Sequence, residues 1–149
     1  MSITATAPRR SSPTTPPSST SARISFRAIP APGDEETGHG PGAGFTVNVP
    51  LPAGTGDAEL IRAFREELVP KAQAFRPELV LISAGFDAHR DDPLAGFAVT
   101  EAGFAELTRI VRGLAEAHCR GRLVSVLEGG YHLLALGRSV EAHLRALLE

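Results

Sequence analysis

The chain has 149 residues, 42% of them apolar and 21% charged, which is ordinary for one soluble globular domain. Its net charge of −2 argues against a nucleic-acid or anionic-membrane surface, and no apolar run reaches transmembrane length. A single cysteine, Cys119, excludes an internal disulfide and a cysteine-rich zinc site. We therefore expect a cytoplasmic protein without a secretory signal, a nucleic-acid partner or a membrane partner.

The first part of the chain is rich in Ser, Thr, Pro and Ala. Such a segment buries too little apolar surface to offset its ordering entropy, so we predict a disordered tail over residues 1–23. Residues 24–29 are a candidate short strand. Residues 30–44, which are rich in Gly and Pro, are predicted to form a long loop.

A regular pattern begins with residues 45–49 (FTVNV), a predicted strand ended by Pro50. Asp57 is the expected N-cap of a helix that runs to about Phe75. Pro70 should kink or divide this helix, because proline lacks a backbone N–H. Its apolar face is formed by Leu60, Phe64 and Leu68.

Two continuous apolar runs follow, LVLIS (79–83) and LVSVL (123–127), and each is typical of a central parallel strand. Between them, Thr100 is the expected cap of an amphipathic helix, and residues 132–148 form the last predicted helix. This alternation predicts an α/β fold with a parallel sheet. His118 and His143 lie on these helices and are expected at the surface or its boundary.

Ligand sites of open α/β sheets form beyond the C-terminal ends of the strands. Asp87 and His89 follow the first apolar run, and an oxygen and an imidazole two residues apart suit zinc. Tyr131 follows the second run on a glycine turn, where its hydroxyl could stabilise an oxyanion. The alternatives are structural: Asp87 caps a turn, His89 lies at the surface, and Tyr131 packs at a helix start.

Three stretches together resemble the histone deacetylase superfamily. They are ETGHGPGAGFTVNVPLPAGTGD (36–57), a stretch from residue 75 to 104 that contains SAGFDAHRDDPL, and VSVLEGGYHLLALGRSV (124–140). The nearest resemblance is to the bacterial branch of acetylpolyamine amidohydrolases, acetoin-utilisation proteins and class II-like deacetylases. It implies a three-layer α/β sandwich around a parallel sheet, related to arginase, of which residues 24–149 are the C-terminal part and the N-terminal half is incomplete.

By this resemblance Asp87 is one of the family's zinc ligands, whereas His89 is not. Tyr131 corresponds to the tyrosine that polarises the substrate amide, and Gly129 and Gly130 shape the pocket beside it. The implied reaction removes acetyl groups from acetyl-lysine or acetylpolyamine-type amides, with a bound Zn²⁺ ion.

The chain departs from the family pattern in the residues that it lacks. The family's tandem His-His base and the Asp-x-His that supplies two further zinc ligands lie upstream, and residues 1–23 contain no histidine or aspartate. We therefore expect a truncated chain that neither holds zinc nor hydrolyses amides alone. Two alternatives stay open: a stand-alone binding or scaffold module, or half of a two-chain enzyme completed by a missing N-terminal half.

Overall fold

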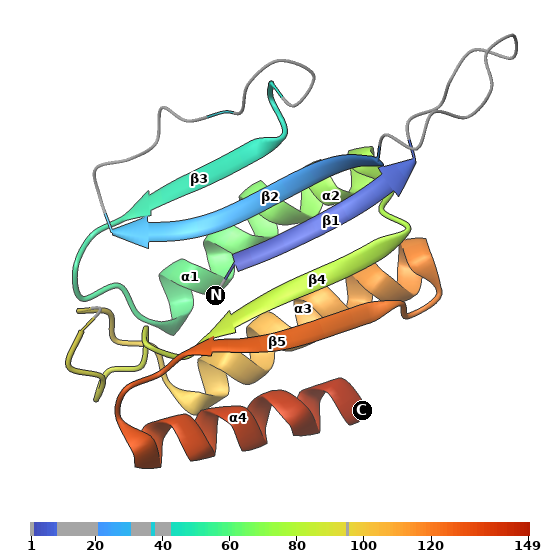
Figure 1. Cartoon of the computed structure of the whole chain (residues 1–149). Coiled ribbons are helices and arrows are strands. Elements are labelled where there is room, and N and C mark those ends of the chain that lie inside the picture. The colour runs from blue at the N-terminus through green and yellow to red at the C-terminus, as the bar shows by residue number, and fades with distance from the viewer. Residues whose placement is uncertain (1, 9–20, 31–36, 38–42, 95) are drawn as a thin grey trace, which may run out of the picture.

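The computed structural model describes residues 2–8, 21–30, 37, 43–94 and 96–149, the first two segments as strands. One sheet has the strand order β3-β2-β1-β4-β5 (Figure 1). Its strands are β1 (Ser2–Pro8), β2 (Ser21–Pro30), β3 (Thr46–Leu51), β4 (Leu79–Gly85) and β5 (Leu123–Gly129). The helices are α1 (Asp57–Ala63), the π-helical segment η2 (Phe64–Leu68), α2 (Val69–Phe75), α3 (Glu101–Cys119) and α4 (Leu133–Leu148).

The predicted α/β fold is confirmed, but the sheet is parallel only in part. β2 pairs with β3 and β4 pairs with β5 in parallel, whereas β1 is antiparallel to both β2 and β4. In β4, buried positions alternate with half-buried ones, and β5 is more exposed. Among the described residues, the apolar runs of these strands are therefore not buried equally on both faces.

β1 corrects the prediction of a disordered tail for the part of it that the structure describes. Ser2–Pro8 lies between β2 and β4, with Ile3 opposite Ile82 and both side chains buried. Hydrogen bonding to strands on both sides, together with burial of Ile3 and Ala5, offsets the ordering entropy that composition alone emphasises. β2 likewise begins at Ser21, and residues 9–20 of the expected tail lie outside the described residues.

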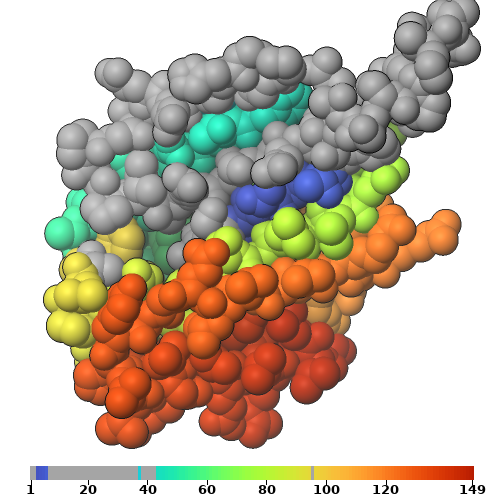
Figure 2. Space-filling model, in the orientation of Figure 1, coloured from blue at the N-terminus to red at the C-terminus, as the bar shows by residue number. Residues whose placement is uncertain are grey.

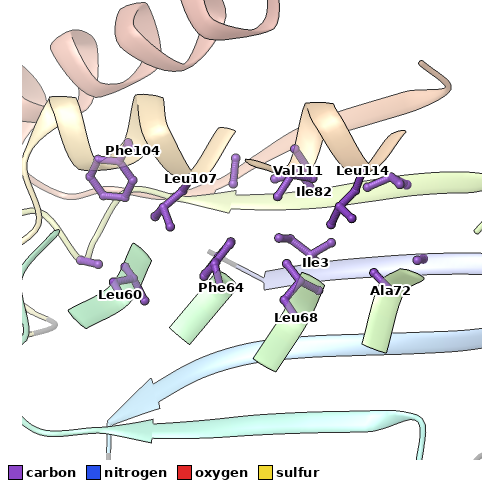
Figure 3. Packing of buried hydrophobic residues seen from close by; sticks show 14 of the residues in the cluster. Ile3, Leu60, Phe64, Leu68, Ala72, Ile82, Phe104, Leu107, Val111 and Leu114 are labelled. Carbon is purple, nitrogen blue, oxygen red and sulfur yellow. The ribbon is translucent and has the colours of Figure 1, made fainter. Parts of the chain in front are cut away.

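The core lies between the sheet and the helices of one face (Figure 3). One side of the core is formed by Leu60, Phe64 and Leu68, and the opposite side is formed by the apolar face of α3. Ile3 and Ile82 close the core from the sheet side. The predicted apolar face of the first helix is therefore confirmed.

Pro70 divides that helix, as expected. It occupies the first turn of α2, directly after the π-helical segment η2. Proline has no N–H to bond to the preceding turn, so the wider turn of η2 lies where regular α-helical bonding has to stop.

None of the described helices is long and apolar enough to cross a membrane.

Asp57 has a different role from the predicted one. The N-cap of α1 is Gly56, and the Asp57 carboxylate instead accepts hydrogen bonds from the backbone N–H and the hydroxyl of Thr100, at 2.8 and 2.6 Å. Thr100 caps α3 as predicted, because its hydroxyl accepts a hydrogen bond from the N–H of Gly103. Asp57 therefore joins the start of α1 to the start of α3.

Candidate active site

The site is built where β4 and β5 end side by side. Because these strands are parallel, the loops that follow them leave the same edge of the sheet. The N–H of Phe86 donates a 2.8 Å hydrogen bond to the carbonyl of Gly129, which holds the two loops together. The two motif segments, which are far apart in the sequence, thus meet as their position after parallel strands predicts.

Asp87 lies directly against Gly129. A Cβ atom added to Gly129 would lie 3.4 Å from a carboxylate oxygen of Asp87, which is an ordinary contact distance, so the carboxylate lies beside the β5 backbone. Gly130 has a φ of +137° and packs against Leu136, whose Cδ1 would lie 2.7 Å from an added Cβ. Glycine is therefore favoured at 130 by its backbone conformation, and a Cβ atom there would also have to displace the end of the Leu136 side chain.

Tyr131 is anchored through its backbone. Its N–H donates a 2.7 Å hydrogen bond to one carboxylate oxygen of Asp92, whose other oxygen accepts from the N–H of Leu94 at 3.0 Å. Tyr131 is 57% exposed, so its side chain is not held in the core. The sequence alone does not indicate Asp92 as a site residue, and its place in the DDPL turn is the only local signal for it.

His89 is a core residue, with 1% of its surface exposed. Its Nδ1 accepts a hydrogen bond from the N–H of Asp91, so in the neutral ring the proton is on Nε2, 3.5 Å from the Glu101 carboxylate. The ring also stacks on Phe104. This burial contradicts the surface alternative for His89.

The pKa of the Glu101 carboxyl is lowered, first by a hydrogen bond with its own backbone at the start of α3 and then by His89. Glu101 is therefore a charged group at a helix N-terminus, which the helix dipole favours. Its carboxylate lies 3.5 Å from Nε2 of His89, on the loop after β4.

His143 is also buried, contrary to the expectation of a surface or boundary position. Its Nδ1 lies 2.7 Å from the Thr108 hydroxyl, and its Nε2 lies 2.9 Å from the Ser125 hydroxyl. Since Thr108 donates its own proton to the Phe104 carbonyl, it accepts from Nδ1–H, and Ser125 donates to Nε2. Burial lowers the pKa of His143. The ring therefore links α3, β5 and α4 as a neutral group.

A zinc ion does not fit the donors that the structure describes. Within these residues, no group of three or more His, Cys, Asp or Glu side chains is arranged to hold a metal. His132, the histidine next to Tyr131, uses its Nδ1 to accept from the N–H of Ala135 as the N-cap of α4. A catalytic zinc ion takes three protein ligands, and Asp87 alone supplies one.

The chain has an α/β fold, and Asp87 and Tyr131 follow two adjacent parallel strands of its sheet. The family model described as "Histone deacetylase domain" matches residues 26–147 of this chain. The chain therefore belongs to the histone deacetylase family, which confirms the resemblance seen in the motifs.

Individual relatives agree with this family. The chain is 47% identical over 113 residues to "Histone deacetylase 14, chloroplastic" of Arabidopsis thaliana, covering 76% of this chain and 27% of that protein. It is 50% identical over 97 residues to a "Probable deacetylase" of Archaeoglobus fulgidus, covering 65% of this chain and 27% of that protein. The crystal structure of the HDA15 HD domain matches with a TM-score of 0.74 and 38% identity, over 83% of this chain and 36% of that one. The chain thus spans about a quarter of the length of these curated relatives.

Proposed function

We propose that this chain is the C-terminal segment of a zinc-dependent, histone deacetylase-like amidohydrolase. The substrates would be acetyl-lysine or acetylpolyamine-type amides. The observation that carries the proposal is the contact of Asp87 with Gly129 at the ends of two adjacent parallel strands, in a chain of this family. We place this protein in the cytoplasm.

Each site residue has a role in this proposal. Asp87 contributes one metal ligand, and Gly129 leaves room beside it. Gly130 turns the backbone so that Tyr131 stands beyond the strand end, where its hydroxyl donates a hydrogen bond to the developing oxyanion of the amide. Asp92 sets the position of that tyrosine through the backbone bond at its nitrogen.

We propose further that the chain is inactive alone. Histone deacetylases are generally zinc-dependent, and the described donors around Asp87 fall short of the three that a catalytic zinc ion takes. No His-His pair is present anywhere in the sequence to act as the base. The remaining ligands and the base would have to come from an N-terminal half.

Half of a two-chain enzyme is the second candidate. Large apolar side chains next to the site are exposed, namely Tyr131, Leu133 and Leu134, at 57, 80 and 71%. A second chain that supplied the missing ligands would contact this side of the molecule. A stand-alone binding module, the third alternative, gains no specific support from these contacts.

The test is an amidase assay with zinc on an acetyl-lysine peptide and an acetylpolyamine. The isolated chain should show no turnover, and co-expression with the part of the Archaeoglobus relative that lies N-terminal to the matched segment should restore it. The restored activity should be lost in Asp87→Ala and Tyr131→Phe but retained in Asp91→Ala, which removes an exposed carboxylate of the same loop. Turnover by the isolated chain that Asp87→Ala abolishes would show that the chain is active alone.

A further inference from the structure

His89 lies in the loop that carries both Asp87 and the hydrogen-bond partner of Tyr131. It stands between Asp87 and Asp92 in the sequence, and the Asp92 carboxylate accepts the hydrogen bond from the N–H of Tyr131. The loop after β4 (yellow) and the segment that follows β5 (orange) lie side by side at the surface in Figure 2. A residue that fixes the shape of this loop therefore also fixes how Tyr131 is held relative to Asp87.

Three hydrogen bonds shape the loop around His89. Its ring Nδ1 accepts from the N–H of Asp91 at 3.1 Å, and its carbonyl accepts from the N–H of Asp92 at 2.9 Å. Its own N–H donates to the carbonyl of Phe86 at 3.1 Å. The ring bond reaches the N–H two residues further on, which is the bond that Asn and Asp side chains make in Asx turns. The imidazole thus shapes the backbone from which the Asp92 side chain leaves.

One nitrogen of this buried imidazole has no hydrogen-bond partner among the described residues. His89 is 1% exposed, and the unpartnered atom is Nε2. The Glu101 carboxylate lies 3.5 Å from it, which is longer than an ordinary hydrogen bond. Because a buried donor without a partner is destabilising, packing against Phe104 alone would favour an apolar side chain here. What histidine supplies, and an apolar residue cannot, is the Nδ1 bond to the turn.

We propose that His89 is a positioning residue for Tyr131. Its ring holds the turn, the turn holds the Asp92 carboxylate, and that carboxylate holds the backbone N–H of Tyr131. His89 touches no substrate and acts through Asp92. The role of Tyr131 towards an amide rests on the proposed function, whereas the positioning concerns residues of this chain alone and is measured without turnover.

Two substitutions at position 89 separate positioning from packing. Asparagine carries an oxygen where histidine has Nδ1, so it can accept from the N–H of Asp91, but it is smaller and leaves a gap beside Phe104. Leucine fills the apolar surroundings but has no acceptor. His89→Leu should therefore be the more stable of the two variants in urea unfolding, and His89→Asn should be the one that keeps the turn.

The readout is the two-dimensional amide NMR spectrum of the full chain. The N–H groups of Tyr131 and Leu94 both bond the Asp92 carboxylate, which moves their proton resonances downfield. Asp92→Ala gives the resonance positions without these bonds. In His89→Leu both signals should move most of the way to the Asp92→Ala positions, and in His89→Asn both should stay near their wild-type positions.

The amide of Ala135 is the internal control. It bonds Nδ1 of His132 at the start of α4, close to Tyr131 but independent of the turn, so its signal should stay in place in every variant. Unchanged Tyr131 and Leu94 signals in His89→Leu would overturn the proposal. So would signals that follow stability, displaced in His89→Asn and not in His89→Leu, or an unfolded His89→Leu chain. A complemented enzyme without amidase activity would count against the proposed function alone, because these signals need no metal and no substrate.

Discussion

Replacing Gly103 by alanine tests the contact that joins the starts of α1 and α3. A Cβ atom at position 103 would collide with Oδ1 of Asp57 and lie 2.6 Å from its Cγ, and 3.0 Å from Cγ1 of Val99. The Asp57 carboxylate would have to move away, and it would then lose its hydrogen bonds to the N–H and hydroxyl of Thr100. We expect Gly103→Ala to destabilise the fold, although alanine normally favours a helix.

The magnitude follows from two opposing effects. Hydrogen bonds to a charged group contribute about 1.5–3 kcal/mol each, and the partial exposure of Asp57 puts these two at the lower end, about 3 kcal/mol together. The change from glycine to alanine inside a helix returns about 1 kcal/mol. The net loss in the free energy of unfolding should therefore be about 2 kcal/mol.

Gly113 provides the matched control on the same helix. It is exposed, and an added Cβ would meet nothing within 4 Å, so Gly113→Ala should stabilise the chain by about 1 kcal/mol. In an Asp57→Ala background the collision is gone, and Gly103→Ala should no longer destabilise. Urea unfolding followed by circular dichroism measures all of these variants, at one protein concentration because self-association would shift apparent stability. Equal stability of Gly103→Ala and Gly113→Ala would refute the reasoning.

Two further predictions concern buried polar groups. Because burial lowers the pKa of His143 below its usual 6.5, the unfolded chain takes up a proton at a higher pH than the folded chain does, so the unfolding free energy should fall as pH drops below about 6.5. His143→Gln should flatten this dependence, and an unchanged pH profile in that variant would contradict the assignment. Ser139 is fully buried, and its hydroxyl has no hydrogen-bond partner among the described residues, so Ser139→Ala should raise stability by about 1 kcal/mol. Loss of stability in Ser139→Ala, measured by urea unfolding, would reveal a partner for the hydroxyl.

Local patterns were enough to locate most of the regular elements. The apolar runs at 79–83 and 123–127 became Leu79–Gly85 and Leu123–Gly129, and the helix expected over residues 132–148 spans Leu133–Leu148. These features depend on residues within one or two turns or on strand alternation, which the sequence displays directly. The meeting of Asp87 with Gly129 was also predictable, because the ends of neighbouring parallel strands share an edge.

Contacts between distant segments were decided only by the tertiary structure. Ser2–Pro8 has the composition of a tail, yet it is a strand because β2 and β4 offer hydrogen-bond partners on both sides. Asp57 bonds Thr100, 43 residues away, and Asp92 bonds Tyr131, 39 residues away, although each aspartate also suits a local cap or turn. His143 is buried because Thr108 and Ser125 satisfy both ring nitrogens. A polar side chain's own neighbours do not show which distant group will pair with it, since that pairing depends on how the elements pack.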